Sequence, residues 1–280
     1  MCNVAQTLIE EKMKRFLIAC VTYNSYTELE RYIKSIDLAA AEVKGIWSVD
    51  VCIADNTTEN IQEPMLKPDS IDSLRYFSFK ENLGYFGAAQ KVLDQTDDLQ
   101  QYDIVTISNV DLEMPRDFFL RLDNLQFEST TGWIANSILS GYENRDRNPK
   151  ILARYTEKRL KQLRLLFRFP ILHQLYTKTL YRRKKINQKK QSMPIYAGHG
   201  SFIMLTKAFF KNNPHLDYPM FLFCEEIYLA ELCRKSNLEV IYKPEICVRD
   251  TEHCSTGKMR KSSYYRYNYD SINYILKTFY

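Results

Sequence analysis

The chain has 280 residues, of which 45% are hydrophobic and 26% are charged, and its formal net charge is +5. This length and composition can bury a sizeable core, which excludes a largely disordered chain, and no stretch approaches the roughly 20 apolar residues that span a bilayer. The N-terminal residues mix acids and bases ahead of a strand-like run, so we expect no secretory signal.

Strand-like and helix-like segments alternate in the first half of the chain. Continuous or alternating apolar runs predict strands at 16–23, 49–54, 74–79, 103–108 and 133–139. Helical spacing predicts helices that begin at a Ser25-x-x-Glu28 capping box, at 86–93 and, after Pro115, at 116–125. This order favours an α/β fold with a mainly parallel sheet and right-handed crossovers.

A basic insert at about 154–193 interrupts this alternation. Between Arg154 and Lys190 the chain carries 13 Lys and Arg residues against one acid, Glu157, so the rest of the chain is net negative. After the insert we expect a strand, a helical turn, a helix that stops at Asn237, a second strand and a Tyr-rich helical tail. These segments are 200–205, 207–211, 225–234, 238–242 and 262–280.

The seven cysteines predict free thiols. Their number is odd, their spacing is wide, and no C-x-x-C pair occurs, so neither a disulfide framework nor a zinc motif is expected. Such cysteine usage is typical of a cytoplasmic protein.

Polar residues follow three of the predicted buried strands: Thr22-Tyr23-Asn24, Asp55-Asn56 and Asn109-Val110-Asp111. In an open α/β sheet, ligands bind outside the carboxyl ends of the strands, so parallel strands would bring all three sets to one edge. Each set alone is also consistent with an ordinary polar turn. Together they favour a ligand site.

Two segments could contact a nucleotide although neither carries a phosphate-binding fingerprint: the segment that contains Asp111, and Asn82-Leu83-Gly84. The chain has no G-x-G-x-x-G and no P-loop motif, so a bound diphosphate would need a metal held by a carboxylate such as Asp111. Asn82-Leu83-Gly84 precedes a predicted helix, and its glycine would allow either a close backbone approach to a ligand or a tight turn.

Acids and histidines of the second half form another set of candidates. Glu225 and Glu226 open a predicted helix, where acids are favourable in any case, but adjacent carboxylates also raise one another's pKa and can supply a base. His199-Gly200 and His253 lie in polar segments, where a histidine is either structural or a ligand.

These residues, in this order, resemble family 2 glycosyltransferases with the GT-A fold, especially bacterial rhamnosyltransferase-like and capsular-polysaccharide enzymes. The similar segments are VTYN at 21–24, ADN at 54–56, ENLGYFGAAQ at 81–90, SNVD at 108–111, HGSFIML at 199–205 and FLFCEEIYLAELCRKSNLEVIY at 221–242. The resemblance implies a nucleotide-sugar-binding half at 1–150 and an acceptor-binding half at 195–256. The basic helical insert at 151–194 and the helical tail at 257–280 lie outside the resemblance.

The resemblance also implies roles for individual residues. Thr22, Tyr23, Asn24, Asp55, Asn82, Gly84, Asn109 and Asp111 would bind the nucleotide sugar. Asp111 and His253 would hold Mg²⁺ or Mn²⁺, and His199 and Gly200 would lie on the acceptor side. Glu226, with Glu225 as second choice, would be the base of an inverting transfer. Three positions depart from the pattern: Asn109 replaces an Asp, Glu226 replaces an Asp, and Tyr228 replaces an acid.

The partners implied are a nucleotide-diphosphate sugar and a glycan acceptor, such as a polyprenyl-diphosphate-linked one, in bacterial surface polysaccharide synthesis. In the insert, Leu160, Leu163, Leu166, Phe167 and Phe169 are interspersed with Lys and Arg, which predicts either an amphipathic helix on an anionic membrane surface or a solvated hairpin. The former would place a peripheral protein on the inner face of the cell membrane.

Other functions remain open on the sequence alone. A catalytically weak or inactive sugar-binding or scaffold protein is consistent with Asn109 and Tyr228. A nucleotidyltransferase would share the fold but needs a Gly-rich basic loop that the segment after the first strand lacks, and a glycosidase would also use paired carboxylates. Nucleic-acid binding is disfavoured, because the chain outside the insert is acidic.

Overall fold

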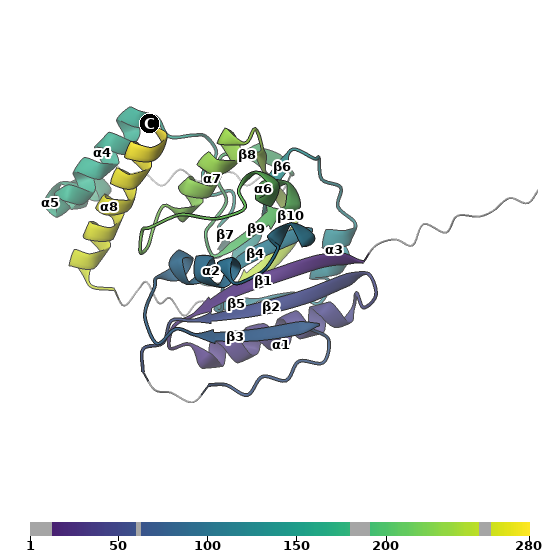
Figure 1. Cartoon of the computed structure of the whole chain (residues 1–280). Coiled ribbons are helices and arrows are strands. Elements are labelled where there is room, and N and C mark those ends of the chain that lie inside the picture. The colour runs from purple at the N-terminus through teal and green to yellow at the C-terminus, as the bar shows by residue number, and fades with distance from the viewer. Residues whose placement is uncertain (1–12, 60–62, 180–190, 252–258) are drawn as a thin grey trace, which may run out of the picture.

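The computed structural model describes residues 13–59, 63–179, 191–251 and 259–280 (Figure 1). Within these ranges the chain forms one ten-stranded sheet with helices on both faces. No helix in the described ranges has the length and apolar character needed to cross a bilayer. The described cysteines, Cys20, Cys52, Cys224, Cys233 and Cys247, are free thiols, as their spacing predicts.

The strands are β1 (Lys14–Thr22), β2 (Trp47–Asp55), β3 (Ser73–Ser78), β4 (Ile104–Asn109), β5 (Leu112–Glu113), β6 (Thr131–Ser140), β7 (Arg145–Asp146), β8 (Met193–Ile195), β9 (Phe202–Thr206) and β10 (Glu239–Asp250). The helices are α1 (Tyr26–Ala41), α2 (Tyr85–Asp94), the short 3₁₀ helix η1 (Leu99–Gln101), α3 (Phe118–Asp123), α4 (Glu157–Arg168), α5 (Pro170–Thr179), α6 (Lys207–Asn212), α7 (Glu225–Lys235) and α8 (Lys261–Phe279).

The first half of the sheet is parallel, in the order β3-β2-β1-β4. The strand β1 is apolar from Phe16 to Val21 because both of its faces are covered there. Phe16, Ile18 and Cys20 pack in the core beneath α1, whereas Leu17 and Ala19 pack in the core beneath α2. The strands predicted from continuous apolar runs in this half are confirmed.

The second half of the sheet is mixed. β9 runs antiparallel to both β4 and β6, while β10 runs parallel to β6. β10 is much longer than predicted and continues past a register shift between Lys243 and Cys247, where Pro244 interrupts the apolar pattern. The short strands β5, β7 and β8 were not predicted. Because one sheet contains strands from both halves, it holds their ends in a fixed relation.

Helix α1 begins at the predicted place without the predicted capping box. Ser25 is its N-cap residue, but its side chain makes no capping hydrogen bond and donates instead to the carbonyl oxygen of Tyr23 at 3.1 Å. Helix α3 begins at Phe118, two residues later than predicted. Both differences are local and leave the buried faces of the helices unchanged.

The basic insert forms the helices α4 and α5, and α4 packs along α8 (Figure 1). This packing corrects the predicted amphipathic surface, because three of its apolar residues face the protein. Leu160 is fully buried, and Leu163 and Phe167 pack against the same core. The tail helix α8 is therefore part of the folded domain, between the insert and the sheet.

Candidate active site

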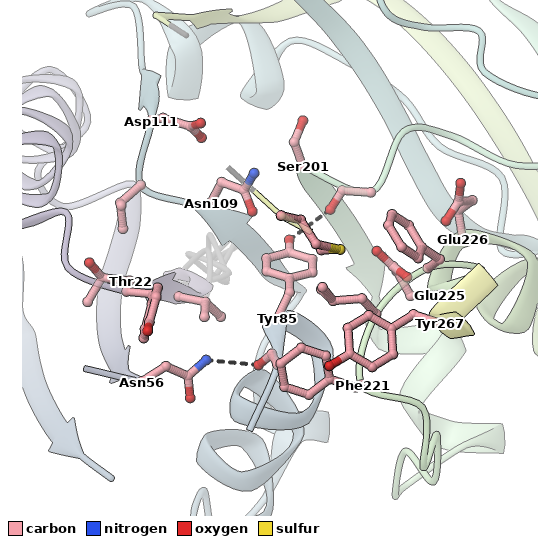
Figure 2. A pocket seen from close by; sticks show the side chains of 18 of the residues that line it. Thr22, Asn56, Tyr85, Asn109, Asp111, Ser201, Phe221, Glu225, Glu226 and Tyr267 are labelled. Atoms are coloured by element: carbon pink, nitrogen blue, oxygen red, sulfur yellow. Dashed lines mark hydrogen bonds between the residues drawn. The ribbon is translucent and has the colours of Figure 1, made fainter. Parts of the chain in front are cut away.

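A cavity of about 700 Å³ lies at the carboxyl ends of β1 and β4 and is walled by residues from both halves of the chain (Figure 2). The parallel register explains how the first half contributes, because Thr22 pairs with Asp55, and Val21 pairs with Asn109. The polar strand ends therefore lie at one edge, as predicted. The predicted site residues in the cavity wall are Thr22, Tyr23, Asn82, Gly84, Asn109, Asp111, His199, Gly200, Glu225 and Glu226.

Two predicted nucleotide-binding residues, Asn24 and Asp55, are not in the cavity wall. The Asp55 carboxylate is 1% exposed and accepts hydrogen bonds from the hydroxyls of Tyr26 and Tyr76, at 2.9 and 2.6 Å, and from the Thr57 amide. The carboxylate oxygens of Asp55 therefore bond to neighbouring residues at the strand ends and not to the cavity. Asn24 has a left-handed backbone conformation, and its backbone N–H donates to Thr57 Oγ1.

Asn56 takes the place in the wall that was predicted for Asp55. Its side chain donates to the carbonyl oxygen of Gly84 at 2.9 Å and accepts from the Leu83 amide at 3.2 Å. The side chain of Asn82 accepts from the Gly84 amide at 3.0 Å. The turn before α2 is thus fastened to the end of β2, and it forms the floor of this part of the cavity (Figure 2).

Gly84 is also the place where the two walls of the cavity touch. Its φ is +77°, and a Cβ atom at this position would lie 2.1 Å from the carbonyl oxygen of Phe221. Only glycine satisfies both conditions. The neighbouring Tyr85 makes a second connection, because its hydroxyl donates to the Gly200 carbonyl oxygen at 2.7 Å (Figure 2).

Three buried side-chain oxygens in the cavity wall lack a hydrogen-bond partner among the described residues: Thr22 Oγ1, Asp111 Oδ1 and Glu225 Oε2. Buried polar atoms are nearly always paired, because an unpaired one costs roughly 1–3 kcal/mol. Three unpaired oxygens around one cavity indicate a polar ligand that would complete their bonding.

Asp111 fits the role of a metal ligand. Burial raises the pKa of its carboxyl group to about 6, and the nearby Asp250 carboxylate adds to this shift. A divalent cation would relieve the repulsion and would bind the free Oδ1. Thr251 donates twice to the Asp111 carbonyl oxygen, so the end of β10 is held beside this residue.

On the side of the cavity formed by the strand ends, the described residues supply one carboxylate, Asp111, and not a complete metal cage. No group of three or more His, Cys, Asp or Glu side chains in the described part of the chain could hold a metal ion. Asp250 is paired with Arg147 at 2.5 Å. His253, predicted as the second ligand, lies outside the described residues. A metal at Asp111 would therefore take further ligands from a bound diphosphate.

Glu225 and Glu226 lie on the opposite side of the cavity, in the first turn of α7 (Figure 2). Burial and, to a smaller extent, the charge of Glu226 together raise the pKa of Glu225 to about 8. Gly200 lies beside the Glu225 carboxylate, since a Cβ there would make an ordinary van der Waals contact with its Oε1, at 3.4 Å. A buried carboxylate with a pKa near neutrality suits proton transfer.

The backbone before this pair is strained. Phe223 and Cys224, which are not glycines, have φ values of 73° and 62°. Such left-handed residues cost of order 1–3 kcal/mol each and persist where the surroundings hold them. Here the Tyr218 hydroxyl donates to the Phe223 carbonyl oxygen at 2.5 Å. The strained pair turns the chain so that α7 starts with both carboxylates at the cavity.

Helix α8 holds the same loop from the other side. Ser271 Oγ donates to the Leu222 carbonyl oxygen at 2.7 Å, and the Tyr264 ring packs edge-on against Phe223 at 5.4 Å. The sequence analysis assigned no site residue to the helical tail, yet Ser263 and Tyr267 of α8, and Met259 just before it, line the cavity. No local motif marks them, because they reach the site through tertiary packing.

His199, which was predicted to lie on the acceptor side, is held as a neutral imidazole. Burial lowers its pKa well below its usual value, and the cations Lys150, Arg147 and Arg145 lower it further. Its Nδ1 accepts from the Ser201 amide at 3.2 Å, which leaves the ring proton on Nε2. Arg147 and Lys150, from the segment after β7, line the cavity and were missed by the motif analysis.

Comparisons with known proteins agree with this geometry. The family model for glycosyl transferase family 2 matches residues 18–206, which is most of the chain. A solved structure of GalNAc-T7 with UDP, GalNAc and Mn²⁺ is similar in fold, with a TM-score of 0.52 and 11% sequence identity over 86% of this chain. The match covers 44% of that chain. No curated protein sequence matches. The chain therefore belongs to glycosyl transferase family 2 and has the GT-A fold.

Proposed function

We propose that the chain transfers a hexosyl or rhamnosyl residue from a nucleotide-diphosphate sugar to a hydroxyl of a glycan acceptor, with inversion, in bacterial surface polysaccharide synthesis. The observation that carries the transfer is the set of unpaired buried oxygens on Thr22, Asp111 and Glu225 in one cavity. Thr22 and Asp111 come from strand ends where GT-A enzymes bind their donor, and Glu225 stands across the cavity from them (Figure 2).

On the donor side, Asp111 would hold Mg²⁺ or Mn²⁺ together with the donor diphosphate. When bound, the cation would stabilise the negative charge that develops on the leaving nucleoside diphosphate. Asn109, which lies half-buried in the same wall, adds an amide where many family members have a second carboxylate. Asn56 and Asn82 add side-chain amides, while Asp55 orders the strand ends.

On the acceptor side, Glu226 or its neighbour Glu225 would take the proton of the acceptor hydroxyl. The acceptor oxygen then forms a bond to the anomeric carbon, the bond from that carbon to the diphosphate oxygen breaks, and the nucleoside diphosphate leaves with the electron pair. The resemblance assigns the base to Glu226, whereas the burial and raised pKa of Glu225 support Glu225 as a second choice.

An inactive sugar-binding protein is the alternative that one observation favours. Tyr228, at the position of a third acid in related enzymes, is 4% exposed, and its hydroxyl accepts a hydrogen bond from the Asp217 amide. The Tyr228 side chain is therefore part of the hydrophobic core. Together with Asn109, it leaves the site with fewer carboxylates than the family pattern.

Asp111→Asn tests the proposal against this alternative. With Mn²⁺ and a panel of UDP-, GDP- and dTDP-sugars, we expect the wild type to hydrolyse or transfer at least one donor, and the variant to lose about 100-fold or more of that activity. Mn²⁺-dependent nucleotide binding, measured by calorimetry, should weaken in parallel. Asp97→Asn, on an exposed residue, is the matched control. Equal activity of Asp111→Asn and wild type would refute the metal assignment, and nucleotide-sugar binding without turnover would support the alternative.

We further propose that the insert docks on an anionic membrane surface, which would bring the cavity to a lipid-linked acceptor. The described insert exposes five apolar side chains around the α4–α5 junction, each at least 45% exposed: Leu165, Phe169, Ile171, Leu172 and Leu175. Exposed Lys158, Lys161, Arg168 and Lys178 surround them. Apolar side chains beside basic ones suit an interface with anionic lipid.

Liposome sedimentation tests this docking. The wild type should bind vesicles that contain phosphatidylglycerol more tightly than vesicles of phosphatidylcholine alone, and added salt should reduce binding. Ile171→Asp should weaken binding, whereas Met65→Asp, on an exposed residue of another loop, should not. Equal binding of Ile171→Asp and wild type would exclude this surface.

A further inference from the structure

We infer that the rings of Phe221 and Tyr267 form the platform on which a pyranose ring of the acceptor stacks. This inference rests on the proposed transfer and names the part of the cavity that receives the acceptor. The two rings come from distant segments, the loop before α7 and the first half of α8, and both line the cavity. Figure 2 shows them next to one another, on the same side of the cavity as Glu225.

The two rings form a continuous aromatic surface. Their centroids lie 4.9 Å apart, and their planes meet at 40°. Both side chains are half-buried, so part of each ring faces the cavity while the rest is packed. The outward face of a carbohydrate ring carries several C–H groups, which are attracted to the negative face of an aromatic ring. A sugar ring is thus a suitable occupant.

The platform is rigid before any ligand arrives. The Phe221 backbone lies against Gly84, at a distance that excludes any side chain there. The next residue, Leu222, accepts the hydrogen bond of Ser271. On α8, Asn268 is buried beside Tyr267, and its side chain bonds back to the Tyr264 carbonyl oxygen. Rings that are already fixed lose little conformational entropy when a ligand binds.

The position of the platform favours the acceptor over the donor. Thr22 and Asp111, the polar groups proposed to bind the metal and the nucleotide diphosphate, lie across the cavity from the rings (Figure 2). A base must reach the hydroxyl that it deprotonates, and Glu225 stands next to the platform. A ring stacked on Phe221 and Tyr267 therefore presents its hydroxyl edge toward the carboxylate pair.

One neighbour competes for the platform. The Arg266 guanidinium lies 5.0 Å from the centroid of the Tyr267 ring. Arg266 is exposed, so its side chain can leave the ring at small cost when a sugar binds.

The test compares Tyr267→Leu, which keeps an apolar side chain but removes the ring, with Tyr267→Phe, which keeps the ring. Saturation-transfer NMR with methyl glycosides of glucose, galactose, rhamnose and N-acetylglucosamine measures sugar binding without any transfer reaction. We expect Tyr267→Leu to weaken the best-bound glycoside about fivefold or more, and Tyr267→Phe to bind as the wild type does. Tyr269→Leu, on α8 but outside the cavity wall, should also bind normally. Thermal unfolding of each variant checks that α8 remains folded.

Two outcomes would overturn the inference. Unchanged glycoside binding in folded Tyr267→Leu would exclude the platform. Weaker binding of UDP, GDP or dTDP in that variant, with unchanged glycoside binding, would assign the rings to the donor. The proposed transfer fails separately, if no nucleotide sugar is turned over by the wild type. Because the NMR experiment needs no turnover, it decides the platform in either case.

Discussion

The two walls of the cavity are built in different ways. The donor wall, named for the donor binding proposed above, is formed by the ends of β1, β2 and β4 and the turn that leads into α2, so regular parallel strands set its geometry. The acceptor wall, named for the proposed acceptor binding, is formed by a loop with two left-handed residues, Phe223 and Cys224, held by α8 through side chains. Backbone hydrogen bonds therefore position the donor side, and tertiary packing positions the acceptor side.

If the two walls act separately, a change in the carboxylate pair should stop transfer and spare the donor. We expect Glu226→Gln to lower kcat about 100- to 10,000-fold, because the acceptor hydroxyl loses its base, while the affinity for UDP and Mn²⁺ stays unchanged. Steady-state kinetics and calorimetry measure the two effects.

Glu225→Gln identifies which carboxylate is the base. A larger loss of kcat in Glu225→Gln than in Glu226→Gln would move the assignment to Glu225. Glu30→Gln, on an exposed residue of α1, controls for charge removal. Weaker nucleotide binding in both variants would show that the walls are not separable.

Gly84→Ala should disrupt both walls, because it lies where they meet. The new Cβ would overlap the Phe221 carbonyl oxygen in a backbone of φ +77°. We expect the free energy of unfolding to fall by about 2–4 kcal/mol, together with weaker binding of both donor and acceptor. Chemical denaturation measures the first effect.

Gly87→Ala is the matched control, since that glycine lies inside α2 and a Cβ there would make only an ordinary contact with Leu83 at 3.8 Å. It should be neutral or slightly stabilising. Equal stability of the two variants would contradict the close approach at Gly84.

The raised pKa of Glu225, in the acceptor wall, predicts that this residue lowers the stability of the folded protein to an extent that depends on pH. Its ordinary pKa is 4.5, and in the folded protein it is about 8. Between these values the folded state holds a proton that the unfolded state releases, so this residue lowers stability as pH rises from about 4.5 to about 8. Thermal unfolding from pH 5 to 9 should show that Glu225→Gln gains stability over wild type as pH rises. An identical pH dependence of the two proteins would rule out the buried, protonated carboxyl.

Ser271→Ala should have the smallest effect and act on the acceptor wall alone. The variant leaves the Leu222 carbonyl oxygen without its partner, which costs about 1 kcal/mol of stability. We expect a raised KM for the acceptor and an unchanged KM for the donor. Ser262→Ala, at an exposed position of α8, is the control. A change in the KM for the donor alone would contradict the expectation that Ser271 acts only on the acceptor wall.

The same contrast explains how much of the fold the sequence predicts. The parallel strands were predicted because continuous apolar runs mark strands that are buried on both faces, as in β1 and β2. The strands β5, β7 and β8 have two or three residues, too few for any periodicity. The failed capping box at Ser25 shows that a matching residue spacing does not fix a hydroxyl's partner.

The candidate site follows the same division. Asn109 and Asp111 lie at the cavity because a strand end places them there. Asp55 and Asn56 are adjacent, and the sequence could not tell that tyrosine hydroxyls would occupy the former and leave the latter at the cavity. Tyr267 could not be placed at all, since it reaches the cavity only through the packing of α8 on a distant loop.

The position of α8 has a practical consequence for protein engineering. The region that defines family membership ends at residue 206, before Glu225, Phe221 and the whole of α8. A truncation designed on that boundary would keep the donor wall and remove both the carboxylates proposed as the base and the rings proposed as the platform. If those rings bind the acceptor, exchanging residues of α8 would alter acceptor choice and leave the strands of the donor wall untouched.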